Sequence, residues 1–253
     1  MVALDILIPL VLIINGMEGM IISESNQFIF IHNPKCAGTS VRNKLKRYDT
    51  TGDLFFYFLG TAKGITPSAE GLKVTERIVD KAHMPIWLVR NLYPEYFKLF
   101  FKYYVFGFVR NPYDRAISVF NESHREIEAA ALDGSDIAVR AYRDEINRFY
   151  SNLSVSDVNG LNLAYRHAIR QRDMFFLDSK CMADAVIKIE NYDEQIRKIG
   201  CFQPLLLESL KEVERDNKSK YSPNSEDTFS PEVIKHLNYI YEDDFKLFDY
   251  DML

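Results

Sequence analysis

The sequence predicts an α/β fold: a central parallel sheet, flanked by helices on both faces, with a phosphate-binding strand, loop and helix. Two observations predict this fold: an apolar run of strand length at residues 27–30, and a second such run at residues 105–109. Each run leads directly into polar residues that open a helix, as in strand–helix units. Apolar runs of this kind are typical of parallel strands covered on both faces.

The first run leads into a short loop, Ile-His-Asn-Pro-Lys-Cys-Ala-Gly-Thr-Ser at residues 31–40. The first turn of a helix favours a phosphate-like anion, because its free N–H groups and the helix dipole point at the ligand. Gly38 permits close backbone approach, Thr39 and Ser40 add hydroxyl groups, and Lys35 adds a mobile cation. The alternative is that Thr39 or Ser40 only caps the helix.

This loop differs from the nucleoside-triphosphate loop, G-x-x-x-x-G-K-[ST]. Lys35 precedes Gly38 by three residues, and the first glycine of that pattern is missing. The difference counts against a nucleotide kinase, which stays a second hypothesis.

The second run ends at Arg110, after which Asn111 suits the N-cap and Pro112 the first position of a helix. Arg115 and Ser118 share one flank of this helix, and Arg110 can converge on it. Two guanidinium groups and a hydroxyl predict a second anion site, suited to a phosphate monoester. The alternative is a surface ion pair of Arg110 with the acidic residue of the first turn. The apolar stripe that this helix should bury is Tyr113, Ile117 and Phe120.

Two anion sites at strand ends suit a ligand with two separated phosphates. Residues 34–40, Pro-Lys-Cys-Ala-Gly-Thr-Ser, resemble the 5′-phosphosulfate loop of the sulfotransferases, and residues 108–115 with Ser118 resemble their 3′-phosphate motif. Residues 186–193 and 229–248 resemble a further strand segment and the C-terminal close of the branch that contains carbohydrate (Golgi-type) sulfotransferases and their small bacterial relatives. The resemblance begins at about Ile22.

The resemblance implies a P-loop-like sulfotransferase domain at residues 22–253 after an apolar extension at 1–21. It implies transfer of a sulfuryl group from 3′-phosphoadenosine 5′-phosphosulfate (PAPS) to a hydroxyl acceptor, expected to be a carbohydrate, with Lys35 stabilising the leaving 5′-phosphate. The residues implied to bind the nucleotide are Lys35, Cys36, Ala37, Gly38, Thr39 and Ser40 at the 5′-phosphate, Arg110, Ser118 and Arg115 at the 3′-phosphate, and Lys218 in a late loop.

The base that takes the acceptor proton is expected to be a histidine, the usual choice near neutral pH. His83 lies between the two anion motifs and resembles the acceptor-activating histidine of the branch; the alternative is a histidine satisfied in the core. His167 is the second candidate. Glu190 is a third, although a hydrogen-bonding role suits it better, and His32 is interpreted as structural.

The amino-acid composition limits the domain count and the function classes that remain possible. A chain of 253 residues, 47% of them apolar, fits one large domain. The net charge of −5 argues against nucleic-acid binding. Three cysteines predict no disulfide framework. Cys36 is interpreted as a packing residue, and a reactive thiol with a lowered pKa is the alternative. No Asp/His cluster is visible in the sequence, so we expect no metal.

The apolar run from Ile6 to Ile14 is interrupted by Pro9 and falls short of the ~20 residues that span a bilayer. Asp5 stands where a signal peptide favours Lys or Arg. We therefore expect a cytoplasmic protein, with a membrane-anchored form and a lumenal (Golgi) catalytic domain as the alternative. Membrane association and oligomeric state stay open.

A non-catalytic relative that binds a nucleotide or a glycan is the third hypothesis. The acceptor depends on residues 50–80 and 125–160, which we interpret as loops without a readable code, and residues 133–136 and 217–228 also have loop composition.

Overall fold

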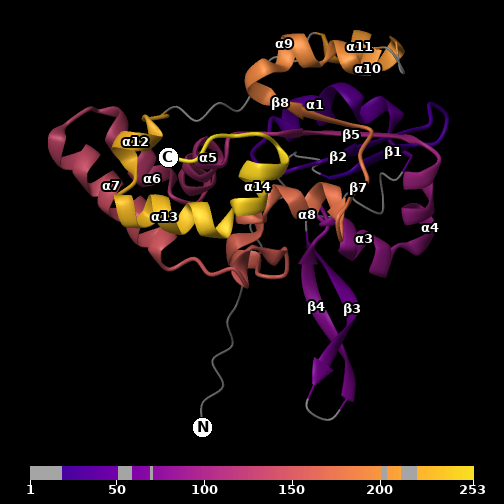
Figure 1. The fold of residues 1–253 in the computed structure, drawn as a ribbon, viewed down its shortest axis with the longest axis horizontal. Helices are drawn as coiled ribbons and strands as arrows, with labels where there is room; N and C mark the ends of the chain where they lie inside the picture. The colour runs from indigo at the N-terminus through magenta and orange to yellow at the C-terminus, as the bar shows by residue number, and fades with distance from the viewer. Residues whose placement is uncertain (1–18, 51–58, 69–70, 201–203, 212–220) are drawn as a thin grey trace.

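Four strands form the central sheet of the computed structural model, which describes residues 19–50, 59–68, 71–200, 204–211 and 221–253 (Figure 1). In sheet order they are β1 (Ile21–Ser23), β2 (Phe28–Ile31), β5 (Tyr104–Val109) and β8 (Ala185–Lys188). β2, β5 and β8 run parallel, whereas β1 pairs antiparallel with β2 at one edge. The predicted α/β fold is confirmed, and β1 makes the sheet mixed rather than wholly parallel.

The strand register brings three polar segments to one edge of the sheet. Ile31 of β2 pairs with Gly107 of β5, and Val109 of β5 pairs with Lys188 of β8. Parallel strands end at the same edge, where open α/β sheets bind their ligands. The chain leaves β2 into residues 32–37, β5 into Arg110, and β8 into the turn η5 (Ile189–Asn191).

Both faces of the sheet are covered, as predicted. Phe28 and Phe30 point to one face and pack with α1 (Gly38–Leu45) and α11 (Pro204–Leu210). Ile29 and Ile31 point to the other face and pack with α3 (Ile86–Leu92) and α8 (Gln171–Phe175). The alternation follows from the two-residue period of a strand, and burial of each such side chain contributes about 1.5–3 kcal/mol.

A helical layer extends the molecule beside the sheet (Figure 1). It contains α5 (Pro112–Ser123), α7 (Asp136–Ser151), α13 (Pro231–Ile240) and α14 (Glu242–Leu247). The Asn111 side chain caps α5 by accepting from the N–H groups of Tyr113 and Asp114. Tyr113, Ile117 and Phe120 are buried against the neighbouring helices, which confirms the predicted stripe.

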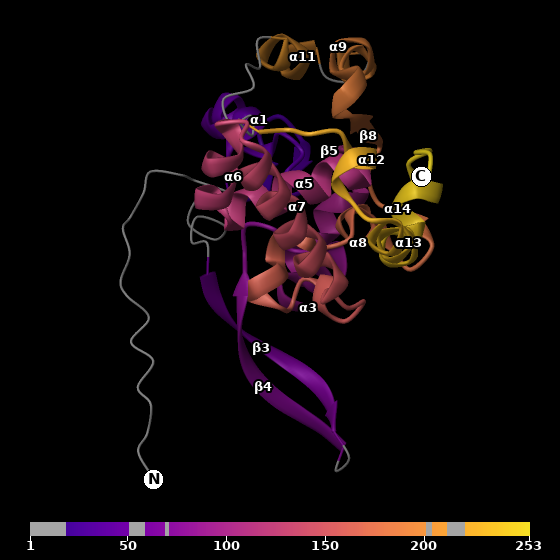
Figure 2. The same ribbon diagram turned by 90° about the vertical axis from the view of Figure 1, so that its left-hand side faces the viewer.

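Residues 50–80 and 125–160 are not simply loops, and that interpretation was wrong. β3 (Leu59–Ser68) and β4 (Gly71–Asp80) form a hairpin that projects from the body in both views (Figures 1 and 2). Residues 125–160 contain α7 and α6 (Arg125–Leu132). The spacing of Tyr142, Ile146 and Tyr150 by four residues gives α7 its buried face.

The other elements are short. They are η1 (Lys46–Tyr48), α4 (Pro94–Phe97), η2 (Lys98–Phe101), η3 (Asp157–Asn159), η4 (Leu163–Ala168), β6 (Phe176–Leu177), β7 (Lys180–Cys181), α9 (Tyr192–Gln195), α10 (Arg197–Gly200) and α12 (Ser225–Thr228). α7 begins at Asp136 and α12 lies within 217–228, so the two predicted loops are shorter than expected.

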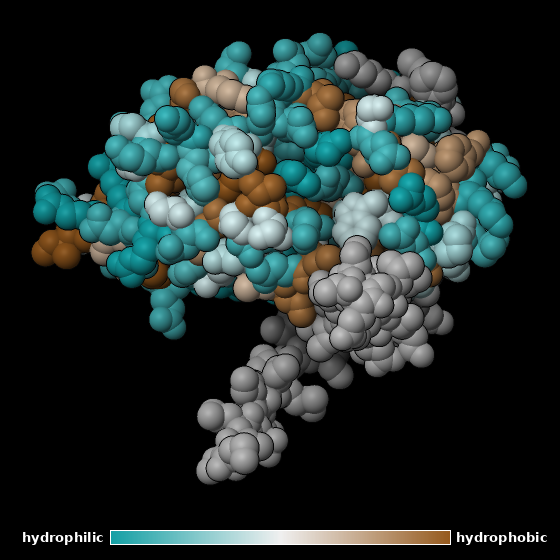
Figure 3. Space-filling view, turned by 60° about the horizontal axis from the view of Figure 1, so that its bottom comes forward, coloured by the Kyte–Doolittle hydropathy of each residue, from teal (hydrophilic) through white to brown (hydrophobic). Residues whose placement is uncertain are grey.

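The face shown in Figure 3 is mostly hydrophilic, with apolar residues scattered between polar ones. Among the described residues no helix has the length and apolar character needed to cross a membrane. The run Ile6–Ile14 lies outside the described residues.

Candidate active site

The loop between β2 and α1 has an unusual backbone. Lys35 has φ 63° and Ala37 has φ 58°, both in the left-handed region that non-glycine residues rarely adopt. Such strained positions concentrate at ligand sites. Ala37 occupies the N-cap position of α1 without a capping side chain, so the interpretation of Thr39 or Ser40 as a simple cap is wrong. The start of α1 is therefore open for an anion.

The imidazole of His32 packs on the first residue of α1. A Cβ atom at Gly38 would lie 1.8 Å from Cδ2 of His32, so only glycine fits under this ring. Nδ1 of His32 accepts the backbone N–H of Gly19 at 3.1 Å. Burial, and then the neighbouring His83, lower the pKa of His32 well below its usual value. His32 is thus a neutral residue that supports the loop, as interpreted from the sequence.

A single buried amide joins the two loops that end β2 and β5. Oε1 of Gln171 accepts from Nδ2 of Asn33 at 3.1 Å and from the N–H of Arg110 at 2.9 Å, and Nε2 of Gln171 donates to the Arg110 carbonyl at 2.8 Å. The backbone N–H of Gln171 donates to Asp244 of α14. These bonds fix the Lys35 loop and Arg110 relative to each other.

Arg110 and Ser118 line the pocket with uncommitted polar groups. The Arg110 guanidinium forms no ion pair with any described residue, and the Ser118 hydroxyl makes no hydrogen bond to one. Glu190 lies nearby, where its carboxylate accepts from the N–H of Asn111 at 2.7 Å and from the Tyr250 hydroxyl at 2.9 Å. We name the region of Arg110, Asp114 and Glu190 the arginine end.

Arg115 and the Cys36 thiol do not line the pocket, which corrects the prediction that these two side chains bind the nucleotide. Arg115 is buried, and its guanidinium donates to the carbonyls of Pro34, His167 and Ile169 at 2.6–3.1 Å. It braces the Lys35 loop from below, so it cannot reach a phosphate. The Cys36 thiol contacts Gln171, and burial raises its pKa to about 12, so it is a packing residue rather than a reactive one.

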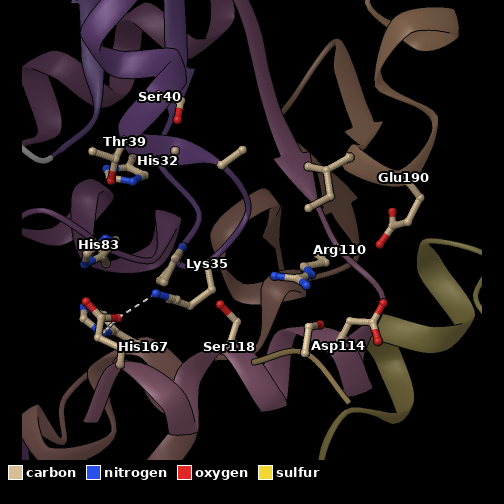
Figure 4. Close-up of a pocket in the computed structure, with 16 residues that line it drawn as sticks. His32, Lys35, Thr39, Ser40, His83, Arg110, Asp114, Ser118, His167 and Glu190 are labelled. Atoms are coloured by element: carbon tan, nitrogen blue, oxygen red, sulfur yellow. Dashed lines mark ion pairs between the residues drawn. The ribbon is translucent and has the colours of Figure 1, made fainter. Parts of the chain in front are cut away.

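Three histidines meet at the opposite end of the pocket, which we name the histidine end. The ring centroid of His83 lies 4.7 Å from that of His32 and 4.9 Å from that of His167. Figure 4 shows this group on one side, the arginine end on the other, and Lys35 with Ser118 between them. Both histidines proposed as the base are therefore in the pocket, on segments 84 residues apart in the chain.

Each of these two histidines contacts a carboxylate through Nδ1. The His83 nitrogen lies 2.9 Å from Oδ2 of Asp80, and the His167 nitrogen lies 2.8 Å from Oε2 of Glu122. Burial opposes ionisation of both acids, but His83 lowers the pKa of Asp80, and His167 with Lys35 lowers that of Glu122. Burial lowers the pKa of His167, and the bond to Glu122 partly offsets it.

The cluster of Asp80, His83 and His167 places one possible ligand atom from each residue within 4.8 Å of the others. That spacing is compatible with a divalent ion, although the sequence displayed no Asp/His cluster. Arg166 lies 3.5 Å from Asp80 and already compensates its charge, which opposes a cation there. Proton transfer is the chemistry that two carboxylate–histidine pairs support directly.

The pocket has a volume of about 310 Å³ and is lined by eight of the predicted residues, namely Lys35, Ala37, Gly38, Thr39, Ser40, His83, Arg110 and Ser118. Lys218 lies outside the described residues, so its predicted role stays a prediction. Sequence reasoning missed Asp80, Asp114, Glu122 and Ser222. The signal for two of them was available, because Asp114, Ser118 and Glu122 stand four residues apart and so share one face of α5.

The comparisons with known proteins agree with this arrangement. The family model described as "Sulfotransferase family" matches residues 18–251, nearly the whole chain. No curated protein and no solved structure matches this chain. The loop at residues 34–40 and the Arg110–Ser118 segment, which carried the resemblance to this family, line one pocket. The chain therefore belongs to the sulfotransferase family, and the predicted PAPS-dependent sulfotransferase is confirmed.

Proposed function

We propose that the protein transfers the sulfuryl group of PAPS to a hydroxyl of a carbohydrate, with Lys35 at the leaving group and His83 as the base. The observation that carries the proposal is the position of Lys35 between the arginine end and the histidine end of one pocket. In this assignment the 3′-phosphate binds at Arg110 and Ser118. The 5′-phosphosulfate binds at the start of α1, and the acceptor enters beside the histidines.

The reaction exchanges one S–O bond for another. The bond from sulfur to the 5′-phosphate oxygen breaks, a bond from sulfur to the acceptor oxygen forms, and the acceptor proton passes to His83. As in phosphoryl transfer, positioning and charge stabilisation supply most of the catalysis. Negative charge grows on the departing phosphate, and the Lys35 ammonium is the cation best placed to stabilise it.

Asp80 holds His83 in the tautomer that a base needs. The Asp80 carboxylate, 2.9 Å from Nδ1, accepts a hydrogen bond from the N–H group at that position, so Nε2 is left as the nitrogen that can take a proton. The same bond fixes the orientation of the ring. His167 and Glu122 repeat this arrangement beside it, so His167 remains the alternative base.

The lining of the pocket favours a polar acceptor. Among the described residues that line it, only Pro34, Ala37 and Ile189 have apolar side chains, whereas a pocket for an apolar or aromatic acceptor is mostly apolar. A carbohydrate hydroxyl fits this polar surface, and the motifs at residues 186–193 and 229–248 resemble the carbohydrate branch.

Binding of 3′-phosphoadenosine 5′-phosphate (PAP) tests the donor site. PAP should raise the melting temperature, and ATP or AMP should raise it less, because a ligand stabilises the folded state that binds it. Lys35→Ala should lower turnover of labelled PAPS by about 10²–10³-fold with only a modest loss of PAP affinity. Lys44→Ala, an exposed lysine of α1 outside the pocket, is the matched control.

A screen of acceptors with labelled PAPS tests the acceptor class. Transfer to an oligosaccharide supports the proposal, and transfer only to phenols or aliphatic alcohols contradicts it. Normal PAP binding without turnover on any acceptor would favour a non-catalytic relative.

A further inference from the structure

Glu122 shares one carboxylate oxygen between two groups of the pocket. Oε2 lies 3.0 Å from Nζ of Lys35 and 2.8 Å from Nδ1 of His167. Glu122 stands one turn beyond Ser118 on α5, so this face of the helix runs from the 3′-phosphate site to the histidine end. The donor chemistry proposed above gives Glu122 no role.

The ammonium group of Lys35 can therefore pair with either of two anions, the Glu122 carboxylate or the 5′-phosphate of the donor. Its backbone is fixed in the strained loop, but its side chain has four rotatable bonds and keeps about a fifth of its surface exposed. The ammonium now contacts Glu122 (Figure 4, dashed line at Lys35). To assist the leaving group, the same ammonium must contact the 5′-phosphate.

We propose that Glu122 is a positioning residue that competes with the 5′-phosphate of the donor for the ammonium group of Lys35. The inference rests on the proposed function, because it takes Lys35 as the leaving-group cation. For its ammonium group to contact the phosphate, Lys35 must leave Glu122, so the free energy of donor binding is reduced by the free energy of the Lys35–Glu122 ion pair. Glu122 thus sets donor affinity through Lys35.

His167 makes this exchange possible without leaving a buried charge unpaired. When Lys35 moves, Oε2 of Glu122 keeps its contact with Nδ1 of His167 at 2.8 Å. A carboxylate that lost its only partner would be costly in a partly buried site. The carboxylate can therefore stay in place while the lysine leaves.

The test is calorimetric titration of PAP into the full chain and its Glu122→Gln variant. Glu122→Gln should bind PAP about fivefold more tightly, the factor that corresponds to the upper range of a partly exposed ion pair. The exposed Glu126→Gln of α6 is the matched control and should leave the affinity unchanged. The same pair of substitutions is then made in a Lys35→Ala background, where Glu122→Gln should have no effect.

Three outcomes overturn the inference. Glu122→Gln binds PAP as the parent does or more weakly; or it binds more tightly by the same factor without Lys35, so that charge removal alone is responsible; or the parent does not bind PAP, in which case the proposed function fails with it. If Glu122→Gln does not fold, Glu122→Asp takes its place. Its carboxylate is one methylene further from Lys35, so tighter PAP binding by a smaller factor is expected, and unchanged binding overturns the inference.

Discussion

The arginine end and the histidine end of the pocket differ in whether their charged side chains are paired with other side chains. At the arginine end, the guanidinium of Arg110 makes no ion pair with a described residue, and only its backbone is held, by Gln171. At the histidine end, charged groups are already paired, with Asp80 between His83 and Arg166, and Glu122 between Lys35 and His167.

Under the proposed function, this difference separates donor binding at the arginine end from proton transfer at the histidine end. A group that must bind a ligand's charge keeps its donors uncommitted on a rigid backbone. A group that must move a proton needs a partner that fixes its tautomer and orientation. Substitutions at the two ends should therefore change different quantities.

The largest effect is expected at the histidine end. His83→Asn should lower turnover by about 10²–10⁴-fold, because it removes the proposed base, and should leave PAP affinity unchanged. Steady-state turnover with labelled PAPS and PAP titration measure the two quantities. His124→Asn, a histidine outside the pocket, is the control. An equal loss of PAP affinity would mean that the two ends do not divide the work.

Arg115 should reveal itself in folding rather than in ligand binding. Arg115→Met keeps the length of the side chain but leaves the carbonyls of His167 and Ile169 without their guanidinium donor, and the carbonyl of Pro34 with the Cys36 thiol alone. The free energy of unfolding should fall by about 3 kcal/mol. Urea denaturation measures it, and an unchanged midpoint would refute the structural role.

Arg110 is the matched arginine, with the opposite expectation. Arg110→Ala should weaken PAP binding by about 10–30-fold through loss of charge-assisted hydrogen bonds, while the unfolding midpoint stays near that of the parent. Adenosine 5′-phosphate, which lacks the 3′-phosphate, should lose little affinity. Equal losses for both nucleotides would place the 3′-phosphate elsewhere.

The smallest effect concerns pH. His32 has a folded pKa well below 6.5, so below pH 6.5 the unfolded chain binds a proton that the folded chain does not. Stability from this residue therefore falls as pH falls, by at most about 1.4 kcal/mol per pH unit. Burial raises the pKa of Asp244 to about 6, which acts in the opposite direction.

The contribution of His32 is therefore measured as a difference. Thermal unfolding at pH 7.5 and 5.5 is compared between the parent and His32→Asn, and the parent should lose more stability on acidification. Equal losses in the two proteins would show that His32 does not contribute.

The sequence predicts the arginine end and the Lys35 loop well, because each is a continuous segment at the end of an apolar strand. Asn111, Pro112 and the glycine at 38 carry local rules for caps and turns, and these rules hold in the structure. Arg115 was misplaced because helical spacing gives the flank of a residue and not the direction of a long side chain.

The histidine end was predictable only in part. Asp80 ends the hairpin, His167 lies in η4 and Glu122 lies at the end of α5, so tertiary packing alone brings them together. The hairpin was missed because residues 50–80 were interpreted as a loop between the two anion motifs, without a readable code. A pattern along the chain reports neighbours in sequence; Asp80 and His83 are such neighbours, whereas Glu122 and His167 are neighbours only in space.

The side-chain amide of Gln171 holds the loop after β2 and the loop after β5 at a fixed distance from each other. Because one side chain is bonded to Asn33 on one loop and to both backbone groups of Arg110 on the other, neither loop can shift without the other. A ligand whose two phosphates are closer together or further apart cannot be accommodated by adjusting one loop. Under the proposed function, selection of the donor by the distance between its phosphates is therefore set by the framework beneath the pocket.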